Sequence, residues 1–334
     1  MAFLISIVIT VVFLPTTIEM LEERNKFAED VHKKDKQMVP KGGGFVLLFA
    51  VVAALLIIVG FSTFIMQNAV NPAILGALVS ILMAGMVGLL DDNLDFRDRT
   101  KIALPLVASI PLMALNVGTT TMSIPLIGDV NLQWAYPLLV VPLMTTFIVD
   151  STNMYGGMNG LECGLSIVNS SAIVVYALLT PILTGNGLVQ NQMDGATIAA
   201  SLLGASIVFF LFNKYPAKVL PGDVGRLPIG AAMAASLIIG NMDRLAVILY
   251  LPFLLNFMMY LVYRLKVKRT GMDYQKFAKP KEDGSLDVVG PYTMYWLLPH
   301  FFQNVTERKN VFFLILLQAI LAYGGVILLL VVGI

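Results

Sequence analysis

Long apolar runs alternate with short polar segments along the chain, and the lengths of these runs indicate its architecture. A bilayer core about 30 Å thick is crossed by a helix of roughly 20 mostly apolar residues, because every backbone amide must find its partner within the segment. Ten charge-poor runs approach that length, and they span residues 2–19, 43–65, 71–90, 102–118, 133–150, 162–183, 195–212, 227–241, 245–263 and 310–333. The pattern predicts an all-α, polytopic integral membrane protein with ten transmembrane helices.

The positions of Lys and Arg predict the orientation of these helices. Basic residues in short loops are retained on the cytoplasmic side of a membrane. Of the 22 Lys and Arg in the chain, 21 fall in five alternate loops, and Arg244 falls in a loop of the other set. The five loops are 20–42, 91–101, 151–161, 213–226 and 264–309. The bias therefore predicts that these five loops are cytosolic and that both termini are extracytoplasmic.

Composition agrees with a membrane protein and excludes several other classes. The chain is 57% hydrophobic and 13% charged, whereas soluble domains carry about a quarter charged residues. A net charge of +1 gives no reason to expect nucleic acid as a partner. The single cysteine, Cys163, excludes an internal disulfide and a CxxC metal site. We expect one membrane-embedded domain over residues 1–334, with a cytosolic insertion at about 264–309 that holds a short hairpin and an amphipathic helix.

Three polar clusters fall in the predicted cytosolic loops and could line one cavity. They are Asp91-Asp92 with Lys101, the segment STNMYGGMNGLE at 151–162, and PGDVGRLPIG at 221–230. Carboxylate and carboxamide oxygens are the ligands that Mg²⁺ prefers, with Mn²⁺ as the alternative. Glycine amides in these loops can approach an anion closely. The combination favours phosphoryl transfer, in which positioning and charge neutralisation do most of the work.

Each cluster also has a plainer explanation when it is taken alone. The acidic pair is compatible with a solvated loop start or a helix cap, and Asp223 with an ordinary helix N-cap. The glycine-rich stretch at 151–162 is compatible with a tight turn between helices, and the basic run 264–269 with a positive-inside anchor. His32 and His300 are isolated in the sequence and form no catalytic pair by spacing.

Taken in order, the clusters resemble the polyprenyl-phosphate N-acetylhexosamine-1-phosphate transferase family. The resemblance runs nearly end to end and is carried by EDVHKKDKQMVPKGGG (29–44), GLLDDNLDFRDRTKIALP (88–105), NMYGGMNGLECG (153–164), GDVGRLPIG (222–230) and ERKNVFFLILLQ (307–318). Within the family, these segments are most similar to the dolichyl-phosphate GlcNAc-1-phosphate transferase branch of archaea and eukaryotes. The resemblance implies that UDP-GlcNAc donates GlcNAc-1-phosphate to a polyprenyl (dolichyl) phosphate, which gives polyprenyl-PP-GlcNAc and UMP. In that branch this is the first membrane step of lipid-linked oligosaccharide synthesis for N-glycosylation.

The resemblance also implies roles for individual residues. Asp223 and Asn153 would hold Mg²⁺ on the donor diphosphate, Asp91 and Asp92 would position or deprotonate the lipid phosphate, and Lys101 would neutralise its charge. The remaining substrate-binding residues that it implies are Asp30, Val31 and Lys33 in the first loop, Asn159 on the uracil, Gly160 and Glu162 after it, Leu220 and Gly222 before Asp223, and Lys276, Lys279 and Lys281 near the diphosphate. Glu162 follows the NGL turn and is expected to support that loop.

Two departures from the family pattern bear on the substrate. The bacterial branches that use a muramyl-pentapeptide carry a histidine-rich motif in the last large loop, whereas residues 264–299 contain no His. In relatives an aromatic residue three positions before the GD aspartate can cover the uracil, and Leu220 occupies that position here. Leu220 therefore leaves open how the base is stacked. Another UDP-N-acetylhexosamine remains an alternative donor.

Three further expectations concern class, location and assembly. A secondary transporter is the alternative from another class, but transporters place ionisable residues near the bilayer midplane, and here the charges lie at or beyond the ends of the predicted spans. The compact loops favour an archaeal plasma membrane over an endoplasmic reticulum membrane. The sequence leaves a homodimer open.

A phosphate monoester is largely ionised near neutral pH, with a second pKa near 6, which favours direct attack by the lipid phosphate.

Overall fold

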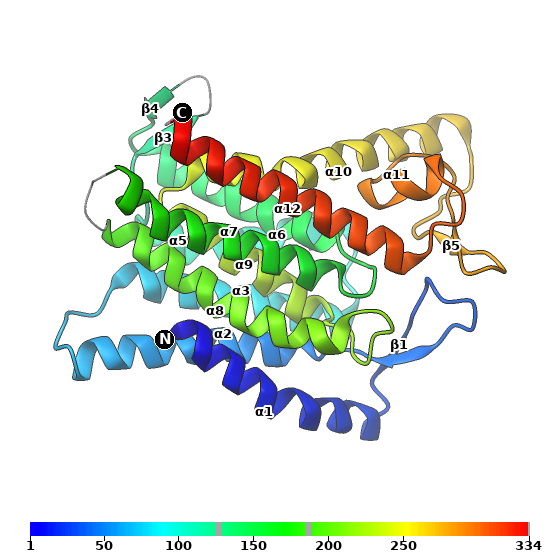
Figure 1. Cartoon of the computed structure of the whole chain (residues 1–334), viewed down its shortest axis with the longest axis horizontal. Helices are drawn as coiled ribbons and strands as arrows, with labels where there is room; N and C mark the ends of the chain where they lie inside the picture. The colour runs from blue at the N-terminus through cyan, green and yellow to red at the C-terminus, as the bar shows by residue number, and fades with distance from the viewer. Residues whose placement is uncertain (125–127, 185–188, 333–334) are drawn as a thin grey trace.

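A bundle of long helices forms the protein, and their connections gather at two ends (Figure 1). The structure is a computed structural model that describes residues 1–124, 128–184 and 189–332. Within these residues, eight helices are long and apolar enough to cross a membrane. They are α1 (Ala2–Glu23), α2 (Gly44–Phe64), α3 (Pro72–Leu94), α6 (Val141–Met154) with the π-helical turn Tyr136–Val140 before it, α7 (Leu161–Thr184), α8 (Gln190–Asn213), α10 (Asp243–Thr270) and α12 (Glu307–Val332). The predicted polytopic membrane protein is confirmed at this level.

The other two predicted spans form shorter helices. Residues 102–118 are covered by α4 (Asp98–Ala103) and the ten-residue α5 (Pro105–Ala114). Residues 227–241 fall mostly in α9 (Asp223–Ile239), which is 17 residues long. Every residue of α9 from Leu227 to Ile239 is buried. A helix enclosed by others on all sides can be rich in small residues and short, since it does not need to reach lipid along its length. The count of ten spans and the orientation of the termini stay predictions.

Three small antiparallel hairpins accompany the helices, and the sequence predicted only the last of them. They are β1 (Phe27–Glu29) with β2 (Met38–Pro40), β3 (Thr121–Ile124) with β4 (Gly128–Asn131), and β5 (Lys279–Pro280) with β6 (Leu286–Asp287). The β5–β6 hairpin and α11 (Met294–Phe301) confirm the hairpin and helix expected within 264–309. A single bridge between Lys41 and Leu220 joins the segment after β2 to the connection between α8 and α9.

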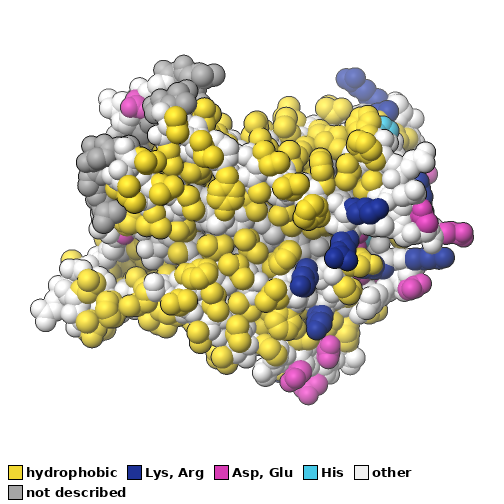
Figure 2. Space-filling view, in the orientation of Figure 1, with side chains coloured by type: hydrophobic (Ala, Val, Ile, Leu, Met, Phe, Trp, Pro, Cys, Tyr) yellow, Lys and Arg dark blue, Asp and Glu magenta, His cyan; other side chains and the backbone are white. Residues whose placement is uncertain are grey.

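Charged side chains collect at one end of the bundle. Figure 2 shows a broad hydrophobic band over the helices and most of the visible Lys, Arg, Asp and Glu at the end where β1, β5 and α11 lie. The chain ends N and C lie in the other half of the molecule (Figure 1). The loops predicted to share one face therefore meet at the same end of the fold.

Glycines allow α2, α3 and α9 to touch backbone to backbone at this end. A Cβ on Gly88 of α3 would lie 2.2 Å from the carbonyl oxygen of Asp223. A Cβ on Gly44 of α2 would lie 2.4 Å from the Cα of Gly225. These distances leave no room for a side chain, so the two glycines fix the spacing of three helices around the first turn of α9.

Candidate functional site

Two adjoining cavities open among the polar loops. The larger has a volume of about 380 Å³ and the smaller about 170 Å³. Four residues line both of them: Lys41, Gly157, Arg226 and Phe277. Two wider depressions, of about 560 Å³ beside Trp134 and about 590 Å³ along α10, have no Asp or Glu among their described lining residues. The adjoining pair is therefore the candidate site.

Most of the predicted site residues come together at these two cavities. The smaller cavity is lined by Asp30, Val31, Asn159, Glu162, Leu220 and Gly222. The larger cavity is lined by Lys101, Asn153, Asp223 and Lys276. Asp91 and Asp92 are not among the described lining residues, but they pair with Lys101 and Lys41, which are. Segments separated by up to 246 positions in the sequence, from Asp30 to Lys276, thus contribute to one site.

Asp91 links the two charged groups of the larger cavity. It lies near the end of α3, is 5% exposed, and pairs with the Lys101 ammonium at 3.0 Å. Its Oδ1 also accepts a hydrogen bond from the backbone N–H of Phe96 at 3.0 Å. Its carboxyl group lies near enough to Asp223 to help raise the pKa of that side chain. Asp91 is thus positioned to orient both Lys101 and Asp223.

The pKa values of Asp223 and Lys101 are both raised by their surroundings. Burial raises the pKa of Asp223 to about 6, and the neighbouring carboxyl groups of Asp91 and Asp92 act in the same direction, while the charge of Arg226 opposes them. Burial disfavours the charge of Lys101, yet hydrogen bonds to Asp91 and Asp95 outweigh it and raise the pKa of its ammonium. Lys101 therefore remains a cation at the cavity wall, beside an excess of carboxylates.

Asp92 points away from Asp91 and caps α9. Its Oδ2 accepts a hydrogen bond from the backbone N–H of Val224 at 2.9 Å, and its Oδ1 pairs with Lys41 at 2.9 Å. Gly222 makes this approach feasible, because its φ is +68° and a Cβ there would lie 2.6 Å from Oδ2 of Asp92. Both oxygens of Asp92 are thus engaged by the protein, and the cap that the sequence placed on Asp223 is supplied by Asp92 from another helix.

A buried ion pair connects the two cavities. Glu162, 3% exposed, accepts a hydrogen bond from the N–H of Gly157 at 2.8 Å and pairs with Arg226 at 2.8 Å. The other guanidinium nitrogen of Arg226 lies 3.8 Å from Asp223. Arg226 was not predicted as a site residue, although its position three residues after Asp223 places both side chains on the same face of a helix. Glu162 supports the 156–160 loop, as its position after the NGL turn predicted.

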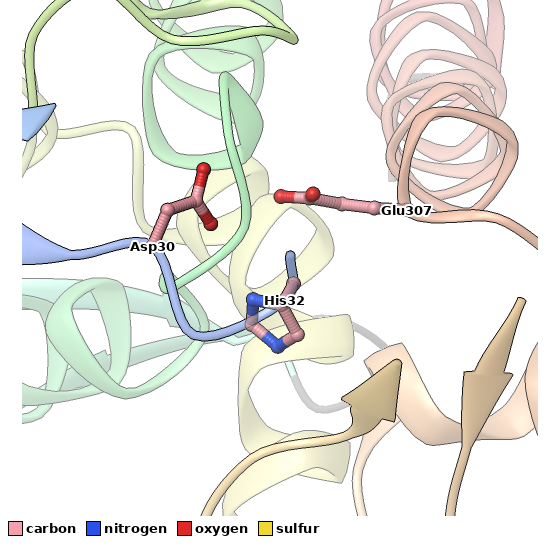
Figure 3. A group of neighbouring side chains, drawn as sticks. All are labelled: Asp30, His32 and Glu307. Carbon is pink, nitrogen blue, oxygen red and sulfur yellow. The ribbon is translucent and has the colours of Figure 1, made fainter. Parts of the chain in front are cut away.

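The first loop lies against the start of α12, where Asp30 faces Glu307 (Figure 3). Asn159 donates from its side chain to Asp30 at 2.8 Å and from its backbone to Glu307 at 2.7 Å. Lys33 pairs with Asp30 at 3.2 Å and with Glu307, and its ammonium lies 4.1 Å above the ring of Tyr215. Glu307 was not singled out from the sequence, although it opens the ERKN segment. This network fixes Asn159 beside Val31 at the smaller cavity.

Asp30, His32 and Glu307 are also close enough to suggest a metal site. Their ligand atoms lie within 4.8 Å of one another, and Figure 3 shows the two carboxylate groups facing each other with His32 beneath them. However, Lys33 bridges both carboxylates and supplies the positive charge that a metal would bring. Burial lowers the pKa of His32 to about 4, so its imidazole is neutral. We interpret the group as an ion-pair network.

A divalent cation fits the larger cavity better. Asp223 and Asn153, from α9 and α6, both line it and offer oxygen ligands only. Burial is the largest cause of the raised pKa of Asp223, and the neighbouring carboxyl groups of Asp91 and Asp92 add to it. A hard cation such as Mg²⁺ would favour the ionised form of Asp223 and would accept this set of donors.

Comparison with known proteins identifies the family. The family model described as glycosyl transferase family 4 matches residues 74–241. A putative UDP-N-acetylglucosamine–dolichyl-phosphate N-acetylglucosaminephosphotransferase of Saccharolobus solfataricus is 30% identical over 301 residues, covering 89% of this chain and 85% of the relative. The chain belongs to glycosyl transferase family 4. A UDP-N-acetylglucosamine–dolichyl-phosphate N-acetylglucosaminephosphotransferase of Schizosaccharomyces pombe is 26% identical and covers 74% of the chain and 63% of the relative.

This family 4 member also matches the bacterial branch. A phospho-N-acetylmuramoyl-pentapeptide-transferase of Listeria monocytogenes is 27% identical over 282 residues, covering 80% of the chain and 83% of the relative. The resemblance found in the sequence motifs is thus confirmed, and the transporter alternative gives way to a transferase. The matched range 74–241 contains both acidic residues of α3 and the loops before α7 and α9, but not the first loop or residues 264–309.

Six predicted residues of this transferase are not among the described lining residues of either cavity: Asp91 and Asp92, whose contacts are given above, and Lys33, Gly160, Lys279 and Lys281. Lys279 and Lys281 lie on the β5–β6 hairpin, where Lys281 pairs with Asp287 at 3.6 Å, so only Lys276 of the three lysines reaches the larger cavity. Lys33 is held in the network of the first loop. Gly160, with φ +82°, shapes the turn before α7 and donates its N–H to Asn213 at 3.1 Å.

Proposed function

We propose that this family 4 transferase moves GlcNAc-1-phosphate from UDP-GlcNAc to a polyprenyl (dolichyl) phosphate and releases UMP. The observation that carries the proposal is the pair of adjoining cavities: one lined by Val31 and Asn159, the other by Lys101, Asn153 and Asp223. The smaller suits a uridine, and the larger suits a diphosphate that meets a second phosphate. The curated names of relatives at about 30% identity describe the same reaction.

The reaction needs positioning and charge neutralisation more than a strong base. An oxygen of the lipid phosphate attacks the β-phosphorus of UDP-GlcNAc, a new P–O–P bond forms, and the bond from that phosphorus to the bridging oxygen breaks so that UMP leaves. The acceptor is already ionised near neutral pH, so direct attack requires no deprotonation step. Lys101 neutralises acceptor charge, and Asp91 orients Lys101 through their ion pair.

A divalent cation, Mg²⁺ or alternatively Mn²⁺, would be held by Asp223 and Asn153. When bound it supplies charge neutralisation on the donor diphosphate. Arg226 contributes a fixed positive charge where the two cavities meet, and Asp92 orients α9 so that Asp223 faces the larger cavity. Lys276 adds a cation from the last loop.

Uracil recognition is assigned to Asn159 together with the backbone near Val31. The Asp30 carboxylate and Glu307 hold Asn159 in place through its side chain and backbone. Gly222 and Leu220 complete the wall. Lys33 acts here through Asp30 rather than on the nucleotide.

The setting follows from the substrates. A lipid acceptor and a soluble nucleotide sugar require a site at a membrane surface, and the charged end of the bundle is the side we assign to the cytosol, with ten spans and both termini extracytoplasmic. We assign the protein to an archaeal plasma membrane and its reaction to the first membrane step of N-glycosylation. A homodimer is compatible with this arrangement.

The direct test incubates purified protein with radiolabelled UDP-GlcNAc, Mg²⁺ and a polyprenyl phosphate. We expect UMP release and a labelled lipid in equal amounts. UDP-GalNAc in a parallel reaction tests the alternative donor. Absence of both products with either donor would overturn the proposal.

A further inference from the structure

Phe277 lies where the smaller cavity meets the larger, and nothing in the family motifs points to it. Among the described residues that line the smaller cavity, it carries the one aromatic ring, since Leu220 is aliphatic. We propose that the Phe277 ring packs against the uracil of the nucleotide sugar and so provides the stacking surface that Leu220 does not. This inference rests on the proposed use of a UDP-sugar and adds a specificity-determining residue to it.

The ring lies over the loop that carries the predicted uracil ligand. A Cβ on Gly157 would lie 3.8 Å from Cε1 of Phe277, which is an ordinary van der Waals distance. Gly157 precedes Asn159 by two positions and adopts a φ of +117°. The aromatic face and the polar edge-recognition group are therefore neighbours, as a flat heterocycle requires. Aromatic rings stack on every base, and the hydrogen bonds to the base edge give the selectivity.

The backbone of Phe277 is held firmly. The hydroxyl of Tyr263 accepts from the N–H of Gln275 at 2.8 Å and donates to the carbonyl of Gln275 at 3.2 Å. The side chain of Gln275 donates to the carbonyl of Phe277 at 2.8 Å, and the following residue, Ala278, is 1% exposed. A stacking surface that is ordered before the ligand arrives loses less conformational entropy on binding.

His32 supports the same ring from the first loop. The two rings meet edge to face, with centroids 5.9 Å apart and planes at 84°. His32 is 4% exposed, and neither of its ring nitrogens has a hydrogen-bond partner among the residues that the structure describes. A neutral, buried imidazole pressed against Phe277 acts as a positioning residue. This contact gives His32 a function that its isolated place in the sequence did not suggest.

The position of Lys276 indicates on which side of the Phe277 ring the base and the diphosphate of the donor would lie. Its ammonium is 5.2 Å from the centroid of the Phe277 ring, and Lys276 lines the larger cavity only. The ring thus separates a basic, phosphate-binding side from the side of Val31 and Asn159. A uridine diphosphate laid across this boundary has its base on the ring and its diphosphate beyond it.

The test measures nucleotide affinity and kinetics in Phe277 variants of the full chain. Loss of base–aromatic stacking by alanine substitution corresponds to roughly 5- to 150-fold in affinity. Phe277→Ala is expected to raise the Kd for UMP and the KM for UDP-GlcNAc within that range, while kcat changes less than about 2-fold. Phe277→Tyr retains a ring and is expected to stay close to the unsubstituted protein. Leu220→Phe, added to Phe277→Ala, is expected to restore part of the affinity.

Two controls separate base packing from other effects. Inorganic pyrophosphate as an inhibitor lacks the base, so its inhibition constant should be the same in Phe277→Ala and in the unsubstituted protein. Phe302→Ala, which removes an aromatic side chain that is 63% exposed, should leave all constants unchanged. If Phe277→Ala does not fold, Phe277→Leu compared with Phe277→Tyr decides the question, because both retain bulk and only one retains the ring.

The outcomes distinguish this inference from the proposed function. An unchanged Kd for UMP in Phe277→Ala, in a protein whose unsubstituted form transfers GlcNAc, overturns the stacking role alone. If the unsubstituted protein binds UMP but transfers no GlcNAc, the sugar assignment fails and the UMP measurements still decide the role of Phe277. If the unsubstituted protein binds no UMP, both proposals fail.

Discussion

Gly88 controls the distance between the two helices that carry the site's carboxylates, and Gly88→Ala is the sharpest test of that geometry. The new Cβ would lie 2.2 Å from the carbonyl oxygen of Asp223 and 2.5 Å from its carbonyl carbon. Ordinary contact begins at 3.4 Å, so α3 and α9 must separate by about 1.2 Å, the difference between the two distances. Neither obstructing atom belongs to a flexible side chain, and the strain is therefore shared by two backbones.

The separation affects both stability and catalysis. Overpacking of this kind costs about 1–3 kcal/mol. A misplacement of about 1 Å between groups that must act together can lower turnover by about 100-fold. Because this contact sets the spacing between Asp91 on α3 and Asp223 on α9, we expect kcat to fall by about that factor. The affinity for UMP should change much less, since the smaller cavity does not include Gly88.

The assay combines transfer kinetics with thermal denaturation in detergent. Gly60→Ala in α2 is the matched control, because a Cβ there meets nothing within 4 Å and the substitution only improves helix propensity. If Gly88→Ala has the turnover and thermal stability of the control, then the close contact of α3 with α9 does not set the site geometry, and the reasoning is refuted.

Four further predictions test other parts of the site. Asp223→Asn should raise the Mg²⁺ concentration needed for half-maximal activity by at least about 10-fold, and an unchanged Mg²⁺ titration would move the metal to other ligands. Glu162→Gln removes the carboxylate nearest to Arg226, leaves it with the more distant Asp223 at 3.8 Å, and should lower the free energy of unfolding by about 1–3 kcal/mol in denaturation, which a neutral result would contradict. His32 has a folded pKa of about 4 against an unfolded value of 6.5, so its contribution to stability is complete above pH 6.5 and falls as the pH drops toward 4. Between pH 7.5 and pH 5 the unsubstituted protein should lose about 2 kcal/mol more stability than His32→Phe, a comparison that cancels the opposite contribution of Asp223 with its raised pKa of about 6. Cysteines placed at Asp95 and Lys281 should react with a membrane-impermeant reagent from the same side of the bilayer, and labelling from opposite sides would break the assigned topology.

The acidic pair illustrates what a sequence motif leaves undecided. Asp91 and Asp92 are adjacent, and the motif assigns them one role. Successive side chains on an α-helix point about 100° apart. Asp91 accordingly contacts Lys101 and Asp223, whereas Asp92 reaches Lys41 and the first turn of α9. Only the packing of α3 against α9 separates an orienting carboxylate from a helix cap.

The sequence also did not predict contacts between segments that are far apart in the chain. Lys33 and Glu307 form an ion pair across 274 positions, and Phe277 meets His32 from the opposite end of the chain. For Lys276, Lys279 and Lys281 the sequence instead predicted more contacts than the structure shows. The family resemblance implied phosphate contacts for all three, but Lys279 and Lys281 lie on the β5–β6 hairpin and only Lys276 lines the larger cavity.

The sequence by itself determined that this is a membrane protein, which loops share one face, and which chemistry those loops can perform. Insertion of a helix depends on the transfer free energy of its own residues, which can be summed along the chain without knowledge of the fold. The tertiary structure alone decided which charges pair, which glycines set helix spacing and which aromatic ring lines the smaller cavity. Those features depend on side-chain direction and on contacts between segments far apart in the sequence, and no local sum contains them.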